Sequence, residues 1–198
     1  MPAIEHWTLR DGTPATLRPI HASDAPALDA LIRGLSPEDR RRRFHGSISG
    51  VTPERLHGMV EVDETRECAF VVLTGTASRQ TLVGDARYVV DATGRGAEFA
   101  LMVAGPWQRR GIGERAIAAL QRIAAAAGLR WLYGSVLADN APMLALMRHC
   151  GFLCTRSRID RHLVCVEAGM DPRQRFAAPS LAVSPVPAPS LTRLALHV

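Results

Sequence analysis

The sequence contains no lysine, and the 24 residues counted as lysine or arginine are all arginine. Arginine stays protonated in proteins and does not act as a nucleophile or a general base near neutral pH. Functions that depend on a lysine amine are therefore excluded. These include Walker-type phosphate loops, Schiff-base catalysis and lysine general bases.

Long apolar runs and a leader segment are also absent. No run approaches the roughly 18–20 apolar residues that span a bilayer. Residues 1–7 lack the basic and apolar regions of a signal peptide. We therefore expect a cytoplasmic protein that does not engage a membrane.

Cysteine is scarce, and its spacing does not suit a metal site. No two cysteines form a C-x-x-C pair, and their spacings to His149 and His162 match no common zinc finger or ribbon. We interpret them as reduced thiols and expect no bound metal. The four cysteines are Cys68, Cys150, Cys154 and Cys165.

The net charge of +5 does not by itself indicate a nucleic-acid partner. The arginines are spread along the chain, and the one dense run, Arg40–Arg43, is not interleaved with aromatic residues that could stack on bases. This run is interpreted as a solvated helix face, with a site for an acidic partner left open.

The N-terminal third predicts a hairpin followed by helices. Short strands at 7–9 and 15–18 flank an Asp11-Gly12 turn. Apolar residues then recur at helical spacing in 28–35. Three helix starts are predicted from capping residues and first-turn prolines, at Ser23-Asp24, Ser36-Pro37 and Thr52-Pro53.

The remaining pattern predicts an α/β (α+β) fold with a mixed, largely antiparallel central sheet flanked by helices on both faces. We expect one domain at 1–168 and a Pro/Ala-rich C-terminal tail at 169–198. The predicted elements are a meander of strands at 68–73, 82–90 and 97–103, a helix from 111, a strand at 131–136, a helix at 140–150 and a hairpin at 152–166.

A glycine-containing turn, Gln108-Arg109-Arg110-Gly111-Ile112-Gly113, stands between a predicted strand and a predicted helix. Unpaired N–H groups at a helix N-terminus attract phosphate, and the glycines permit close approach of the backbone. Arg109 and Arg110 add charge suited to a pyrophosphate and a 3′-phosphate. The turn therefore predicts a site for a phosphorylated cofactor.

A dinucleotide-binding fingerprint is the main competing interpretation of the turn. Residues 111–116 fit G-x-G-x-x-A, and Asp139 ends the next strand, where a ribose-binding acid can lie. That fingerprint needs its strand to run almost directly into the first glycine, whereas a bulky connection containing Pro106 separates Val103 from Gly111. A coenzyme A site is favoured over NAD.

At these residues the chain resembles the GNAT superfamily of acyl-CoA-dependent N-acyltransferases, over roughly residues 15 to 167. Q-x-x-G-x-G is that superfamily's pyrophosphate motif, and Asn140 with Gly151-Phe152 matches its second motif. A narrower likeness is to the GNAT domain of bacterial Pat-type protein lysine acetyltransferases. It is carried by Leu35-Ser36-Pro37-Glu38, Arg43-Phe44, 52–56, 62–67, 97–100 and 136–140.

The resemblance implies acetyl-CoA as co-substrate and a set of residues that contact it. Strand residues are expected to pair with pantetheine, the turn to hold the pyrophosphate, and Asn140 to orient the cofactor or the substrate. The implied residues are Leu101, Met102, Val103, Gln108, Arg109, Arg110, Gly111, Ile112, Gly113, Asn140 and Met147.

Glu98 is the candidate general base. Strand alternation places it on the face of Ala100 and Met102, so partial burial should raise its pKa. In the Pat-type domains the glutamate at this position is the proposed base. The alternative is a rim carboxylate paired with Arg87 or Arg95.

Many GNAT enzymes carry a tyrosine as general acid seven residues after the motif asparagine, but this chain has Met147 there. We expect acetyl transfer from acetyl-CoA to a primary amine, with a protein lysine favoured over a polyamine or an antibiotic, by a monomer or homodimer. Two other classes stay open: a non-catalytic acyl-CoA-binding or sensing module, and a nicotinamide oxidoreductase. Asp63, Glu64 and Glu67 are interpreted as solvated loop acids, with a role in binding a cationic substrate as the alternative.

Overall fold

The structure is a computed structural model that describes residues 4–45, 51–76 and 79–170. Two short 3-10 turns, Ala22–Asp24 and Gly105–Trp107, precede α1 and α4. The elements are β1 (Glu5–Thr8), β2 (Pro14–Pro19), α1 (Ala25–Gly34), α2 (Pro37–Phe44), α3 (Pro53–Val60), β3 (Glu67–Thr76), β4 (Arg79–Val90), β5 (Gly96–Val103), α4 (Ile112–Ala126), β6 (Trp131–Leu137), α5 (Ala141–His149), β7 (Leu153–Arg156) and β8 (Leu163–Gly169).

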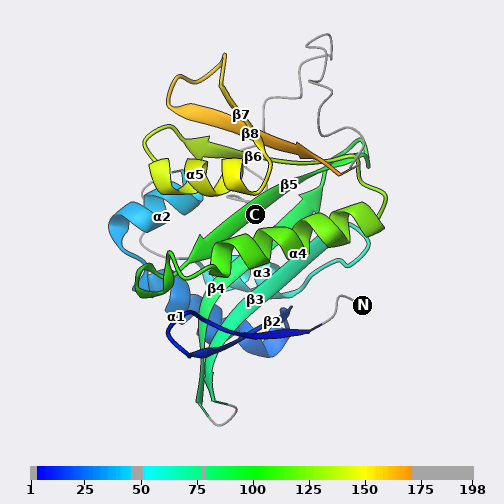
Figure 1. The fold of residues 1–198 in the computed structure, drawn as a ribbon. Coiled ribbons are helices and arrows are strands. Elements are labelled where there is room, and N and C mark those ends of the chain that lie inside the picture. Colours follow the sequence, from blue (N-terminus) through cyan, green and yellow to red (C-terminus); the bar gives the residue numbers. More distant parts are fainter. Residues whose placement is uncertain (1–3, 46–50, 77–78, 171–198) are drawn as a thin grey trace.

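The strands form one sheet in the order β1-β2-β3-β4-β5-β6-β8-β7. Every neighbouring pair is antiparallel except β5 and β6, which are parallel and joined through α4. Helices α4 and α5 lie on one face and α1 and α3 on the other (Figure 1). The predicted mixed, largely antiparallel sheet between helices is confirmed.

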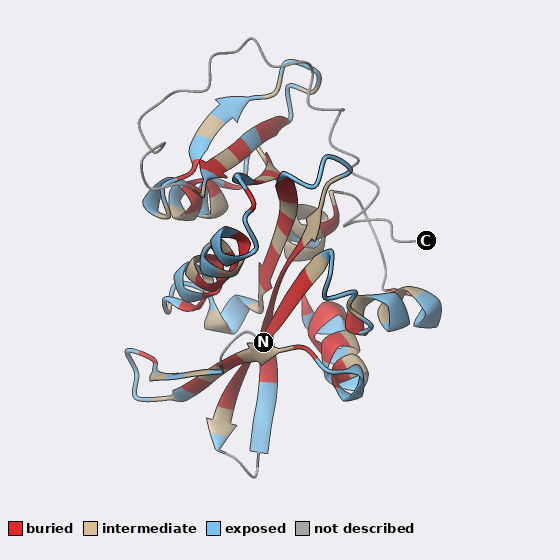
Figure 2. Cartoon of the chain, turned by 90° about the vertical axis from the view of Figure 1, so that its right-hand side faces the viewer, coloured by how far each residue is buried: buried red, intermediate tan, exposed pale blue. Residues whose placement is uncertain are grey.

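The core consists of two layers, one on each face of the sheet. Successive residues of β3 alternate between them: Phe70 and Val72 pack toward α4, whereas Val71 and Leu73 pack toward α1. Such a strand is buried on both faces and therefore has a nearly continuous apolar sequence. Figure 2 shows these buried strands between the helices on either side.

All three predicted helix starts are confirmed, since α1, α2 and α3 begin directly after Asp24, Ser36 and Thr52, but only two of them have the predicted side-chain cap. The Ser36 and Thr52 side chains accept hydrogen bonds from the Asp39 and Arg55 backbone N–H groups, at 3.0 and 3.3 Å. Asp24 is different, because its carboxylate does not cap α1. It instead accepts two hydrogen bonds of 2.7 Å from Arg18, and so ties α1 to β2.

Strands β5 and β6 pair only at their beginnings, where residues 96–98 oppose residues 131–133. Close approach there depends on glycine, since a Cβ on Gly96 would lie 2.5 Å from the Trp131 ring. Beyond this point each strand stays paired on its outer edge, β5 with β4 and β6 with β8. The inner edges therefore diverge and leave an opening in the middle of the sheet.

A buried ion pair joins Asp85 and Arg87 on β4. Asp85 has no exposed surface, and the Arg87 guanidinium donates to its carboxylate and, at 2.9 Å, to the Met59 carbonyl of α3. An ionised pair in this position is tolerated because it is closely paired and hydrogen-bonded. It links the middle of the sheet to α3.

The structure bears on the predicted C-terminal tail, on metal binding and on membrane spans only where residues are described. The predicted tail lies outside the described residues, apart from the last residue of β8 and Met170. Within the described ranges, no three His, Cys, Asp or Glu side chains gather as a group able to hold a metal ion. No helix in those ranges has the length and apolarity to cross a membrane.

Replacing Asp85 should destabilise the fold strongly, because Asp85→Ala leaves the Arg87 guanidinium buried without its anion. We expect a loss of about 3–5 kcal/mol in the free energy of unfolding, measured by urea denaturation. Asp29→Ala is the control: it removes a partly exposed pair with Arg33 on α1 and should change the free energy of unfolding by about 1 kcal/mol or less. Equal effects of the two substitutions would contradict this assignment.

Candidate active site

The turn before α4 exposes an uninterrupted row of backbone donors. Arg109 and Gly111 have positive φ angles of 60° and 84°, and Gly111 begins the helix without a side-chain cap. Among the hydrogen bonds of the described residues, none is donated by the backbone N–H groups of residues 109–114. Such a row of unpartnered N–H groups at a helix N-terminus forms an anion-binding cradle.

Gln108 anchors the start of this cradle. Its side-chain amide donates to the Val103 carbonyl at 3.0 Å and to the Asp39 carboxylate of α2 at 3.3 Å. The amide therefore joins the end of β5 to α2. Gly113 allows α5 to pack closely here, since a Cβ at that position would lie 2.9 Å from Leu146.

A groove of about 340 Å³ runs from this cradle toward the opening between β5 and β6. Its walls come from β5, α2, the turn before α4, and the start of α5. Its lining is formed by Arg10, Leu35, Asp39, Arg42, Arg43, Leu101, Met102, Val103, Trp107, Gln108, Arg109, Gly111, Gly113, Glu114, Asn140, Pro142, Met143 and Leu146.

The groove brings together most of the residues expected to contact coenzyme A. Those that line it are Leu101, Met102, Val103, Gln108, Arg109, Gly111, Gly113 and Asn140. Three others lie elsewhere. Ile112 and Met147 are buried in the core between the sheet and α4, and Arg110 forms an ion pair with Asp11 and stacks on Trp107.

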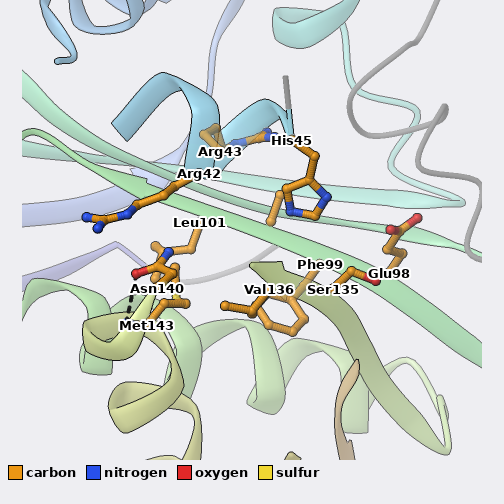
Figure 3. Close-up of a pocket in the computed structure, with 11 residues that line it drawn as sticks. Arg42, Arg43, His45, Glu98, Phe99, Leu101, Ser135, Val136, Asn140 and Met143 are labelled. Carbon is orange, nitrogen blue, oxygen red and sulfur yellow. Dashed lines mark hydrogen bonds between the residues drawn. The ribbon is translucent and has the colours of Figure 1, made fainter. Parts of the chain in front are cut away.

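A second, smaller pocket of about 60 Å³ adjoins the groove where β5 and β6 separate. Arg42, Arg43, Leu101, Asn140 and Met143 line both spaces. The remaining residues of the smaller pocket are His45, Glu98, Phe99, Ala100, Ser135 and Val136 (Figure 3).

Glu98 is half-buried in the smaller pocket. Burial raises the pKa of its carboxyl to about 7, with the nearby Arg43 guanidinium acting in the opposite direction. In the described part of the chain, no hydrogen bond or ion pair engages this carboxylate. The alternative of a pair with Arg87 is not realised, because Arg87 is paired with Asp85.

The arginine run on α2 is not simply a solvated face, and that interpretation needs correction. All four arginines are partly buried, and Arg42 and Arg43 line both the groove and the pocket. Arg42 is ion-paired with Glu38 at 3.0 Å. Burial lowers the pKa of Arg43 to about 10, so its guanidinium is still charged near neutral pH.

His45 follows α2 and contributes its side chain to the pocket. Burial, together with the charge of Arg43, lowers the pKa of its imidazole, while a hydrogen bond to the Ser135 backbone acts in the opposite direction. The ring is therefore neutral near pH 7. In Figure 3 it lies on the same side of β5 as the Glu98 carboxylate.

Asn140 begins α5 and lies where the groove meets the pocket. Its side-chain oxygen accepts a hydrogen bond from the Met143 backbone N–H at 3.2 Å, which fixes its orientation. The preceding residue, Asp139, forms a 2.6 Å ion pair with Arg41 of α2. Helix α2 is thus tied to both sides of the opening, to α5 by Arg41 and to the cradle through Asp39 and Gln108.

Sequence reasoning missed several lining residues, notably Arg42, Arg43, His45, Ser135 and Trp107. The available signal was the Arg40–Arg43 run, for which the sequence leaves a site for an acidic partner open. The helical period places one or two members inward, but the sequence alone does not identify which side chains face the sheet.

Comparison with known proteins agrees with this geometry. The family model for the acetyltransferase (GNAT) domain matches residues 15–153. An acetyltransferase of Pseudomonas aeruginosa is 29% identical over 158 residues, which cover 79% of this chain and 85% of that protein.

Two solved structures share the fold. The GNAT domain of PAT from S. lividans superimposes with a TM-score of 0.75 at 23% identity, covering 84% of this chain and 96% of that one. Spermidine N-acetyltransferase from Vibrio cholerae, in complex with CoA and spermine, gives 0.62 at 18% identity over 79% and 95% of the two chains. The nicotinamide-dinucleotide interpretation is thereby set aside.

Two glycine substitutions should separate ligand binding from backbone strain. Gly111 and Gly128 flank α4, have φ angles of 84° and 75°, and have open space around a built Cβ. Gly111→Ala and Gly128→Ala should each cost about 1 kcal/mol of stability. Only Gly111→Ala should also weaken coenzyme A binding, by about tenfold in titration calorimetry. Equal affinities of the two variants for coenzyme A would show that the cradle is not part of the binding site.

Proposed function

The chain belongs to the acetyltransferase (GNAT) domain family, and on this premise we propose that it transfers acetyl from acetyl-CoA to the amine of a protein lysine side chain. It is an acyl-CoA-dependent N-acyltransferase with acetyl-CoA as its co-substrate. The observation that carries the proposal is that the groove adjoins the smaller pocket, so that the two spaces together lead from an anion cradle to a carboxyl whose pKa is near 7.

The chain's own groups fit an extended CoA thioester. The free N–H groups of residues 109–114 are suited to the pyrophosphate. Backbone groups on the inner edge of β5, after Glu98, have no partner on β6 and can bond pantetheine as a strand would. Acetyl-CoA supplies the activated thioester, and these contacts direct it toward the smaller pocket.

Glu98 serves as the general base. A lysine amine has a pKa of ≈ 10.4, so removing its proton near pH 7 costs roughly 4–5 kcal/mol. A carboxylate with a pKa near 7 is both available and basic enough to accept that proton before the amine attacks. Because no other group in the described residues bonds this carboxylate, it is free to contact the incoming amine.

Among the residues that the structure describes, no side chain is well placed to protonate the departing thiolate. Met147 occupies the usual tyrosine position, and it is fully buried in the core. No tyrosine is among the described residues that line the groove or the pocket. His45 is neutral and its ring is engaged with the Ser135 backbone. We therefore assign that proton to water, since a thiolate is stable enough to leave before it is protonated.

The charge of the site supports a singly charged acceptor over a polyamine. Arg42 and Arg43 line the pocket against a single carboxylate, so an acceptor with several positive charges meets repulsion there. Asp63, Glu64 and Glu67, the other candidates for binding a cation, line neither space, and Asp63 is held in a turn by Thr65. A polyamine is the second candidate acceptor, favoured by the fold shared with spermidine N-acetyltransferase.

The acceptor class can be determined by measuring thiol release from acetyl-CoA. We expect lysine-containing peptides to be acetylated, and spermidine and aminoglycosides to react at least tenfold more slowly because of their additional charges. Mass spectrometry of the peptide product should locate the acetyl group on the lysine amine. A faster reaction with spermidine than with every peptide would overturn the choice of acceptor. Binding of acetyl-CoA with no turnover of any amine would favour a sensing module.

The general-base role predicts a specific pH dependence. Glu98 is active when deprotonated, so kcat/KM should rise with pH up to about 7 and level off above it. Glu98→Gln should lower kcat by about 10²–10⁴-fold and abolish this inflection, with little change in the affinity for acetyl-CoA. Glu61→Gln, an exposed carboxylate of the α3 C-terminus, is the matched control and should behave as wild type. An unchanged inflection in Glu98→Gln would assign the base to another group.

A further inference from the structure

Arg43 is a partly buried cation for which the described residues provide no hydrogen-bond partner. Its Nε and Nη2 atoms are shielded from solvent, and neither has a partner in the described part of the chain. Its guanidinium stacks on the Phe44 ring at 4.9 Å. A buried donor left unpaired costs about 1–3 kcal/mol, and more when it is charged. A ligand that accepts hydrogen bonds from such a group is one physical reason for a native protein to retain it.

The charges around Arg43 do not balance. Arg55 and Arg87 are close enough to lower its pKa, and the opposing carboxylates are Asp85 and Glu98. Asp85 is already occupied by two nitrogens of Arg87. Glu98 loses its charge whenever it accepts a proton. Three guanidinium groups therefore lie near two carboxylates. One of these, Asp85, is already paired, and the other, Glu98, can be protonated, which leaves an excess of positive charge around Arg43.

The position of Arg43 indicates where a compensating anion would come from. The residue lines both the coenzyme groove and the smaller pocket, whereas Glu98, His45 and Ser135 line only the pocket. An acyl group carried by coenzyme A must extend across this junction. The phosphates of the coenzyme are not suited to this role, because the unpartnered N–H groups of the cradle at residues 109–114 offer them a separate site.

We propose that Arg43 binds a carboxylate at the far end of the acyl group, so that the enzyme also accepts succinyl-CoA. This rests on the proposed use of the groove for acyl-CoA. Relative to acetyl, succinyl adds one CH₂ group and one carboxylate, four heavy atoms in all. A pocket of about 60 Å³ has room for about four water-sized atoms.

The transfer step is the same for both acyl groups. The amine nitrogen attacks the thioester carbonyl carbon, and the C–N bond forms as the C–S bond breaks. Glu98 takes one proton from the ammonium before the attack. The nitrogen gives its second proton to water as the amide forms, and the leaving thiolate takes a proton from water, so that only Glu98 ends protonated. The distal carboxylate is unchanged and stays bound to Arg43 throughout.

Binding to the full chain tests the proposal without any acceptor. Succinyl-CoA and butyryl-CoA have acyl chains of equal carbon number and differ in the terminal carboxylate. Calorimetry should show succinyl-CoA binding about ten- to a hundredfold more tightly than butyryl-CoA, as expected for hydrogen bonds to a charged group. Thiol release with a lysine peptide should show the same preference in kcat/KM.

Three variants connect this preference to the residue. Arg43→Gln should abolish the preference for succinyl-CoA while leaving Tm unchanged or raised, because it removes an unpaired buried charge. Arg43→Lys should retain part of the preference, because it keeps the charge. Arg42 lines the same two spaces but is already paired with Glu38. Arg42→Gln should therefore retain the preference for succinyl-CoA.

The outcomes separate this inference from the proposed function. If the protein binds acetyl-CoA but binds succinyl-CoA no more tightly than butyryl-CoA, the carboxylate site is wrong and the acetyltransferase stands. If no acyl-CoA binds, the proposed function fails first. A preference for carboxylate-bearing acceptors, without any preference among acyl-CoA donors, places the anion on the acceptor and overturns the proposal. A preference that survives in Arg43→Gln also overturns it.

Discussion

The divergence of β5 from β6 is the constraint on which the other features of the site depend. The two strands pair over residues 96–98 and 131–133, and each is then held only from outside, by β4 and by β8. Because those outer ladders are complete, the inner edges can part without loosening the sheet. The parting exposes backbone donors and acceptors along β5 and opens the core to a ligand at Glu98.

Helix α2 crosses this opening and contributes its second wall. It is held on one side by Asp39, which accepts from Gln108, and on the other by Arg41, which pairs with Asp139. The contacts join the cradle, the helix and the start of α5. Arg42 and Arg43 are thereby held over the junction between the groove and the pocket, where a thioester is expected to lie.

The electrostatics of the pocket follow from which charges are paired. Arg87 and Asp85 satisfy each other within the core, so neither is available to Glu98. Glu98 is therefore half-buried without a partner, and its pKa rises toward neutrality. Arg43, of opposite charge, is also partly buried and has no hydrogen-bond partner among the described residues. The Glu98 carboxylate is suited to act as a general base, and the Arg43 guanidinium is suited to the recognition of an anion.

Local patterns in the sequence were sufficient for the features that depend on neighbouring residues. Ser36 and Thr52 cap helices because the capping bond reaches only three residues ahead. The glycine turn at 108–113 and the acid within β5 were recognisable because a phosphate cradle and strand alternation are also local. The order of the strands and helices followed from the same short-range periodicities.

The tertiary structure decided which side chains reach the site, since that depends on contacts between residues far apart in the chain. Asp24 pairs with Arg18 rather than capping α1, and Arg110 pairs with Asp11 rather than lining the groove. Met147 packs in the core. Arg43, which the sequence presented as one of four equivalent arginines, is buried because the rotation of α2 against β5 turns it toward the opening. The sequence alone predicted the cofactor cradle and the candidate base; only packing determined the charge that surrounds them.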